Sequence, residues 1–277
     1  MNILTIDLEE WHTYRVFKKG RPEYYEPILE SLLDSVLDLL ELNNIKATFF
    51  CLGVIARKNR HIIKKISGRG HEIACHSDQH LFVNKMNFNQ FAEDTKRAVC
   101  SLEDIVGNKV NAYRAPAFSI DKNTPWAIDI LYENGIKIDC SIFPASRSYG
   151  GIKELSINKP FLIKGENSTL KEFPLNYATF FNNNKIMFSG GGYFRILPYK
   201  MIFKLVSKAN YNMFYFHLRD FDNKQVKVYN KRFFQNYVGV NGALDKLNSL
   251  AQNFEFISLN AANYKIDWEM SKKISLN

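Results

Sequence analysis

The sequence lacks the features of a disulfide scaffold, a structural zinc knot or a membrane-spanning protein. Its four cysteines, at positions 51, 75, 100 and 140, are widely spaced and form no Cys-x-x-Cys pair, so we expect buried free thiols. No stretch is apolar over the roughly 18 residues that a membrane span needs. No linker, internal repeat or low-complexity tract is present. These absences favour one globular domain over residues 1–277.

The chain also lacks the start of a secretion signal. Residues 1–7 reach an acidic side chain too early for a basic segment followed by an apolar one, so we expect a cytoplasmic protein. The net charge of +9 favours acidic partners in general. Because no recognised nucleic-acid module accompanies that charge, we expect no nucleic-acid partner.

Short apolar runs alternate with longer amphipathic runs, which is typical of repeated β-α units around a parallel sheet. The predicted strands are 2–7, 46–52, 70–75, 111–114, 137–141, 172–175, 213–217 and 255–259. The predicted helices are 27–42, 54–66, 89–106, 124–134, 199–209 and 231–251. Residues 143–198 are less regular and read as an insertion, whereas the tail after Tyr264 is uninformative. The pattern therefore predicts an α/β fold.

Two histidines four residues apart, His76 and His80, can supply two of the three protein ligands of a catalytic zinc-type centre. A carboxylate from a distant strand can supply the third ligand and leave one position for water. Such a centre lowers the pKa of its bound water to about 7 and polarises a carbonyl oxygen. The pattern therefore indicates hydrolysis.

Three carboxylates, Asp7, Glu9 and Glu10, follow the first predicted strand and would repel one another without a cation. Because side chains alternate along a strand, Asp7 and Glu9 point to the same side, and we prefer Glu9 as the ligand. If the chain bends sharply after Asp7, Glu10 can serve instead. In a barrel the active site gathers at the carboxyl ends of the strands, where Asp7, His76, Arg114 and Asp139 all fall.

The ordered motifs resemble one family, the polysaccharide deacetylases with a NodB-homology domain, also called carbohydrate esterase family four. The resemblance rests on TIDLEEW at 5–11, ATFF at 47–50, RGHEI at 69–73, HSDQH at 76–80, RAP at 114–116 and FYFH at 214–217. A family branch linked to surface or exported polysaccharides has similar segments at 7–11, 139–144 and 190–195. The resemblance implies a distorted (β/α)7 barrel and one divalent metal ion, usually zinc.

The resemblance also implies roles for individual residues. Asp7 would be the general base, with Arg114 as its partner, and His217 would protonate the leaving amine. Glu9, His76 and His80 would hold the metal, although the family more often has two adjacent aspartates where this chain has Asp7 and Glu9.

Further residues would bind the substrate or orient the acid. The backbone N–H of Ala117 would be the second oxyanion donor, and Trp11 and Phe118 would be aromatic residues at the rim. The carboxylate that orients His217 is left open among three residues, with a preference for the first. These are Asp139, Asp220 and Glu172.

We therefore expect a metal-dependent N-deacetylase acting on an N-acetylated sugar or glycan precursor in surface-glycan biosynthesis. The basic chain suits a lipid-linked or nucleotide-linked precursor and peripheral contact with the inner face of the membrane. Two alternatives remain: a deformylase or cyclic-amide hydrolase on the same scaffold, and a non-catalytic glycan-binding protein.

Overall fold

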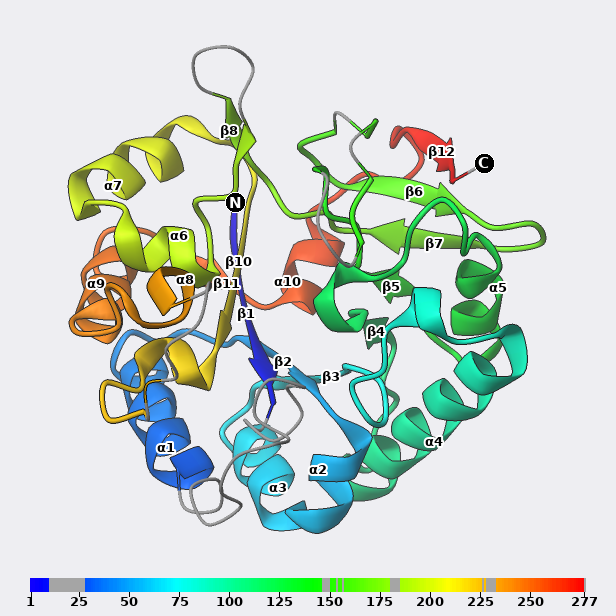
Figure 1. Cartoon of the computed structure of the whole chain (residues 1–277), viewed down its shortest axis with the longest axis horizontal. Helices are drawn as coiled ribbons and strands as arrows, with labels where there is room; N and C mark the ends of the chain where they lie inside the picture. The colour runs from blue at the N-terminus through cyan, green and yellow to red at the C-terminus, as the bar shows by residue number, and fades with distance from the viewer. Residues whose placement is uncertain are drawn as a thin grey trace. The chain divides into compact units, whose positions relative to one another are not determined.

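The computed structural model describes residues 1–9, 28–145, 150–152, 154–155, 157–179, 185–225, 227 and 233–276. Glu10 and Trp11 lie outside the described residues, so their predicted roles stay predictions. The chain divides into two compact units (Figure 1). Unit 1 contains residues 1–48 and 177–262, and unit 2 contains residues 49–176 and 263–277.

Unit 1 is built around the buried strand β1 (Asn2–Leu8), which pairs in parallel with β10 (Asn212–His217). The start of β1 also pairs in parallel with β11 (Phe256–Ile257). Strands of a parallel sheet are covered on both faces, and residues 3–8 of β1 are all buried. The register places Asp7 opposite His217. Two predicted catalytic residues thus meet at the carboxyl ends of neighbouring strands.

Unit 1 contains the helices predicted over 27–42 and 199–209, as α1 and α7, and further helices that were not predicted. In chain order its helices are α1 (Ile28–Leu42), α6 (Gly191–Ile196), α7 (Tyr199–Lys208), η6 (Leu218–Phe221), α8 (Phe233–Tyr237), α9 (Ala243–Ala251) and α10 (Leu259–Tyr264). The single helix predicted over 231–251 is wrong within the described residues, because α8 and α9 are separate. Gly239 and Gly242 lie between them with φ of +74° and +77°, a left-handed conformation that ends a helix.

Unit 2 holds a mostly parallel set of strands (Figure 1). Its strand order is β2 (Thr48–Cys51), β3 (Glu72–Cys75), β4 (Ala112–Tyr113), β5 (Ile138–Asp139), β7 (Thr169–Glu172), β6 (Phe161–Lys164) and β12 (Lys273–Ser275). Its helices are α2 (Gly53–Lys58), α3 (Arg60–Gly68), η3 (Val83–Lys85), α4 (Phe88–Val106), η4 (Pro116–Phe118) and α5 (Trp126–Glu133). The helix predicted over 54–66 is broken at Asn59, whose φ of −128° and ψ of 54° are not helical.

Helix α4, close to the helix predicted over 89–106, buries one face and packs against α2, α3, α5 and β3. An Asn87–Gln90 capping box begins it, and Gly107 with φ +70° ends it. Its buried face includes one carboxylate, Asp94, among apolar side chains. A buried carboxylate needs partners, and those partners lie in the loop after β3.

The region predicted as irregular contains more structure than the sequence indicated. The strand predicted over 172–175 is wrong, because β7 ends at Glu172 and pairs antiparallel with β6. Pro174 follows and has no N–H for a ladder. The hairpin turn is held by Asp129, which accepts hydrogen bonds from Glu166, Asn167 and Ser168.

The chain end is also more regular than expected. The strand predicted over 255–259 is only β11, because Leu259 begins α10 and donates its N–H to Thr48 Oγ1 at 2.8 Å. The tail forms β12, which pairs in parallel with β6. No helix in the described part of the chain is long and apolar enough to cross a membrane.

The cysteines follow the prediction at three of four positions. Cys51, Cys75 and Cys140 are buried free thiols, but Cys100 is exposed on α4. The prediction that all four are buried is therefore wrong for Cys100, which lies on the polar side of that helix.

Candidate active site

Unit 1 brings Asp7, Glu9 and His217 together at the carboxyl ends of β1 and β10. His217 Nε2 lies 3.9 Å from Asp7 Oδ2 and 3.7 Å from Glu9 Oε1. One ligand-type atom from each of the three residues lies within 4.8 Å of the others. Both carboxylates are buried. Asp7 in β1 and Glu9 just after the strand both approach His217, as expected if their side chains point to the same side.

Asp220 of η6 orients His217. Its Oδ2 accepts the backbone N–H of His217 at 2.9 Å and lies 3.3 Å from Nδ1. A carboxylate only accepts, so Nδ1 carries the proton and Nε2 faces the carboxylates of Asp7 and Glu9. The sequence-based preference for Asp139 was wrong, and Asp220, one of the alternatives, makes the contact. A residue three positions after the histidine reaches it through a single 3-10 turn.

The charges around His217 change its proton affinity. Burial lowers its pKa, but the carboxylates of Glu9, Asp220 and Asp7 outweigh burial and raise the pKa above its ordinary value. Burial raises the pKa of Asp220, yet its hydrogen bond and charge interaction with His217 and the charge of Arg195 hold that pKa well below the usual range. The imidazolium form is therefore stabilised, as a proton donor requires.

In unit 2, His76 follows β3 directly, and one of its ring nitrogens makes a hydrogen bond within the protein. The backbone N–H of His76 donates to the carbonyl of Cys51 at 3.0 Å. Its Nδ1 lies 2.7 Å from the carbonyl oxygen of Arg114. Because that oxygen can only accept, Nδ1 carries the hydrogen and the lone pair lies on Nε2. Metal-binding histidines are typically fixed in this way by their second nitrogen.

His80 lies beside His76, with their ring centroids 5.4 Å apart. The backbone between them is strained, since Ser77 and His80 have φ of +72° and +59°. Ser77 Oγ accepts the N–H of His80 at 3.0 Å. Two imidazoles held as neighbours in a strained loop fit a divalent metal by their donor chemistry.

Two helices hold this loop. Helix α2 donates the N–H groups of Gly53 and Val54 to the carbonyls of Ser77 and Asp78, each at 3.0 Å. A Cβ at Gly53 would lie 2.3 Å from Asp78 Oδ1, so only glycine fits there. Arg57 of α2 then binds both carboxylate oxygens of Asp78, at 2.5 and 2.9 Å. This bidentate pair fixes the residue between the two histidines.

Helix α4 contributes Asp94, whose Oδ2 accepts the N–H of Asp78 at 2.8 Å. Burial raises the pKa of Asp94 to about 6, although the hydrogen bond from the Asp78 N–H acts to lower that pKa. Sequence reasoning missed Arg57, Asp78 and Asp94. Asp78 could have been found, because a charged residue inside the histidine motif needs a partner, but nothing local marks the other two.

Arg114 is fully buried after β4, with its guanidinium carbon 4.1 Å from the centroid of the Phe50 ring. Ala117 and Phe118 both have φ of +55°, so the segment after Pro116 is a strained turn. Phe118 is only 3% exposed, and its ring centroid is 5.5 Å from that of Phe143. Phe118 therefore packs inside the fold and is not the exposed rim aromatic that was predicted.

Asp139 and Glu172 form a buried carboxyl pair beneath this turn. Ser141 Oγ donates to Asp139 at 2.5 Å and accepts the N–H of Ala115 at 2.8 Å. Glu172 Oε1 accepts the N–H of Ile142 at 3.1 Å. Burial raises the pKa of both carboxyls, and the charge of Asp139 raises that of Glu172 further. The pair therefore supports the Arg114 turn rather than orienting His217.

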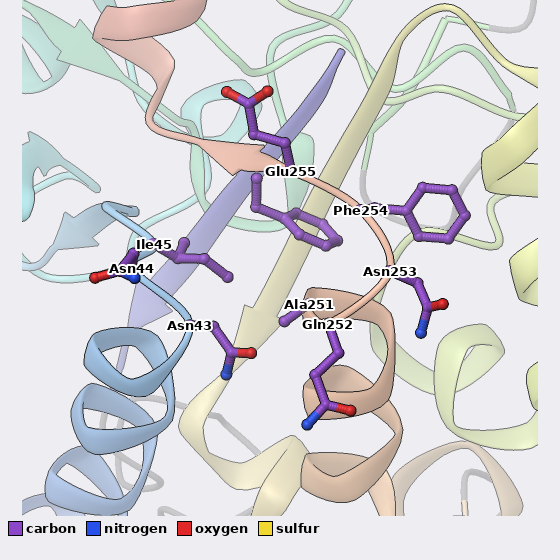
Figure 2. A pocket seen from close by; sticks show the side chains of 9 residues that line it. Asn43, Asn44, Ile45, Ala251, Gln252, Asn253, Phe254 and Glu255 are labelled. Atoms are coloured by element: carbon purple, nitrogen blue, oxygen red, sulfur yellow. The ribbon is translucent and has the colours of Figure 1, made fainter.

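Unit 1 also has a surface pocket, and neither Asp7 nor His217 lines it. Figure 2 shows it lined by the turn after α1, with Asn43, Asn44 and Ile45, and by the chain after α9. It adjoins the beginning of β11, whereas His217 lies at the end of β10. Glu255 is the single titratable residue in its lining. The pocket therefore offers no acid and base pair.

Comparisons with known proteins match two segments of the chain. Residues 17–137 match the family model described as "Polysaccharide deacetylase". Residues 140–263 match one described as "Domain of unknown function (DUF3473)". Asp7 and Glu9 precede both segments, so their assignment rests on the sequence motif and on the geometry of β1.

Two curated relatives are similar to part of the chain. A bifunctional xylanase/deacetylase of Pseudobutyrivibrio xylanivorans is 32% identical over 38% of this chain and 18% of its own length. A peptidoglycan-N-acetylglucosamine deacetylase of Bacillus cereus is 28% identical over 38% of this chain and 42% of its own length. The chain thus spans less than half the length of either relative.

Solved structures resemble the whole chain. A Mycobacterium smegmatis protein assigned to the polysaccharide deacetylases has a TM-score of 0.61 at 17% identity, covering 95% of this chain and 88% of its own. A CE4 family pseudoenzyme from Bacillus anthracis has a TM-score of 0.53 at 13% identity, covering 94% of this chain and 64% of its own. At these identities the likeness shows the fold alone.

Residues 17–137 are thus similar to the polysaccharide deacetylase family, the same family that the sequence motifs resemble. The predicted α/β fold, similar to the (β/α)7 barrel of that family, is confirmed.

Proposed function

We propose that this protein is a metal-dependent hydrolase that removes the N-acetyl group from an N-acetylated sugar during surface-polysaccharide biosynthesis. One observation carries the proposal. A carboxylate base, Asp7, and an imidazole acid, His217, lie side by side at the ends of β1 and β10 in a chain with a polysaccharide deacetylase domain. An amide hydrolase needs such a pair to activate water and to protonate the leaving amine.

Three residues would hold one divalent ion, for which we propose zinc. They are His76 and His80, whose donor chemistry fits such an ion, and Glu9. When bound, the ion would lower the pKa of a water molecule and polarise the acetyl carbonyl. The choice of Glu9 follows from the motif and from its position two residues after Asp7.

The protein's own groups would move the protons. Asp7 would accept the water proton, and His217, held by Asp220, would deliver a proton from Nε2 to the leaving nitrogen. The N–H of Ala117, in the strained turn, would donate to the developing oxyanion. We retain Arg114 as the partner that orients the Asp7 carboxylate, on the family resemblance.

For the substrate we propose a lipid-linked or nucleotide-linked N-acetylated sugar, handled in the cytoplasm with peripheral membrane contact. The net charge of +9 supports an anionic carrier. Sedimentation with vesicles containing anionic lipid tests the membrane contact. No pelleting at low salt would remove that part of the proposal.

Acetate release separates this function from its alternatives. We would incubate the zinc-loaded protein with N-acetylglucosamine oligomers and with lipid-linked and nucleotide-linked N-acetylhexosamines. We expect acetate from at least one of these, a loss of about 100-fold or more in Asp7→Asn, and no loss in Asp104→Asn, an exposed control. Formate or a ring-opened product from other substrates would favour the rival hydrolases. Glycan binding by parent and variant without hydrolysis would favour a binding protein.

A further inference from the structure

The segment 190–195, with sequence Gly-Gly-Gly-Tyr-Phe-Arg, lies within the part of the chain that matches a family model of unknown function. It runs beside β10 just before His217. The N–H of Tyr215 donates to the carbonyl of Ser189 at 3.1 Å, and Gly190 forms a parallel bridge with Tyr215. A Cβ at Gly190 would lie 2.2 Å from the Tyr215 carbonyl oxygen. Glycine is therefore required for this close approach.

The remainder of the segment is the short helix α6, which docks on β10. The Phe194 ring centroid lies 4.8 Å from that of Phe216. The next residue, Arg195, is 4% exposed and places its Nε 3.0 Å from Asp220 Oδ1. Asp220 uses its other oxygen, Oδ2, for His217. One buried carboxylate thus joins Arg195 to the proposed acid.

Arg195 is itself held on its far side. Its Nη1 donates to the carbonyls of Asn236 and Val238, at 2.9 and 3.2 Å. Helix α6 has a second, independent anchor: Lys246 Nζ donates to the carbonyls of Phe194, Arg195 and Leu197. Arg195 and Lys246 both fasten α6, but their contacts differ: Arg195 forms an ion pair with Asp220, whereas Lys246 binds backbone carbonyls of residues 194–197.

We infer that Arg195 is a positioning residue for the proton donor, acting through Asp220, and that segment 190–195 serves to deliver it. Removing one partner of a buried charge pair leaves the other uncompensated, so Asp220 without Arg195 would protonate or turn away. His217 Nδ1 would then lose its acceptor, and the ring would no longer hold Nε2 free of hydrogen in its neutral form. This inference rests on the proposed role of His217.

The test compares Arg195→Met, Arg195→Lys and the matched control Lys246→Met. The first readout is the tautomer of the neutral His217 ring, from ¹⁵N NMR at alkaline pH, assigned with His217→Gln among the six histidines. We expect the Nδ1–H tautomer in the parent and in Lys246→Met. Arg195→Met should populate the Nε2–H form, and Arg195→Lys should restore the parent state in part.

The second readout is kinetic, with zinc content measured on the same samples. We expect kcat for acetate release to fall about 10- to 100-fold in Arg195→Met with KM within about twofold and zinc retained. The parent tautomer in Arg195→Met, or an equal tautomer change in Lys246→Met, would overturn the inference. A parent that releases no acetate would instead defeat the proposed function, while the tautomer comparison would still decide the role of Arg195.

Discussion

Glu172 is a buried carboxyl whose proton links the stability of unit 2 to pH. Burial and the charge of Asp139 raise its pKa well above the ordinary value in the folded state. A raised folded-state pKa contributes stability that is fully present below the unfolded-state pKa and is lost as pH rises through the folded-state value. The folded protein therefore becomes less stable from acid toward neutral pH through this group.

Replacing Glu172 with glutamine should flatten that pH dependence. A proton that the folded state keeps and the unfolded state releases changes the free energy of unfolding by about 1.4 kcal/mol per pH unit. The parent should therefore lose up to about 1.4 kcal/mol of stability for each pH unit above about pH 5. Glu172→Gln should show a shallower slope in urea unfolding at several pH values. The exposed Glu166→Gln serves as control. Parallel slopes in parent and Glu172→Gln would contradict the raised pKa of Glu172 as the source of this pH dependence.

Arg57 should control zinc affinity without touching the ion. Its bidentate pair with Asp78 holds the loop between His76 and His80, and such supporting contacts are typically worth 10- to 100-fold in metal affinity. Arg57→Met should weaken zinc binding by about that factor in a competition titration. Arg60→Met, which breaks only the exposed pair with Asp104, should bind like the parent. Equal affinity in both variants would remove the positioning role.

Individual site residues were predictable where their chemistry is local. Asp7, Glu9 and His217 could be found from strand ends and alternation, and unit 1 brings them together. The partner of His217 was misjudged because the sequence offers three carboxylates, and only the turn of η6 selects Asp220. Arg195 contacts Asp220 from 25 positions earlier in the chain. Such a contact depends on the path of the backbone, which no local pattern records.

At the level of elements, β12 covers an edge that would otherwise be open. It pairs with β6, and the N–H of Leu162 donates to the carbonyl of Lys272 at 2.8 Å. Leu276, just after the strand, is buried. Strand edges without a partner expose backbone groups and lower stability.

Removing residues 271–277 should therefore destabilise unit 2. The lost burial of Leu276 alone is worth about 2 kcal/mol, and the ladder hydrogen bonds add to it. We expect a lower midpoint in urea unfolding of the truncated protein. The exposed Lys273→Ala is the control and should unfold like the parent. An unchanged midpoint after truncation would show that β12 contributes no stability.

The longer helices and the first strands follow from periodicity, because α1 and α4 bury apolar stripes and β1 is a continuous apolar run. The errors occur where the backbone conformation of a single residue decides where an element ends. Asn59 separates α2 from α3 without any glycine or proline to mark the break. Gly239 and Gly242 did mark the break before α9, but the prediction extended one helix across both glycines. Strand β12 was missed because three residues carry too little pattern.

For the whole molecule, matched segments and compact units do not share boundaries. The deacetylase match over 17–137 contributes α1 to unit 1 and most of its length to unit 2. The segment of unknown function, 140–263, supplies His217, Asp220 and Arg195 to unit 1. The proposed base comes from neither matched segment. The proposed chemistry therefore needs the chain as a whole.

The central claim is that a divalent metal held by His76 and His80 makes this chain an N-deacetylase. The most direct measurement is zinc content of the parent and His80→Ala proteins, with acetate release from N-acetylated glycan precursors followed on the same samples. We expect near one equivalent of zinc in the parent, and loss of both zinc and activity in the folded variant. A folded parent that takes up neither zinc nor cobalt, or that releases acetate equally well after His80→Ala, would contradict the account.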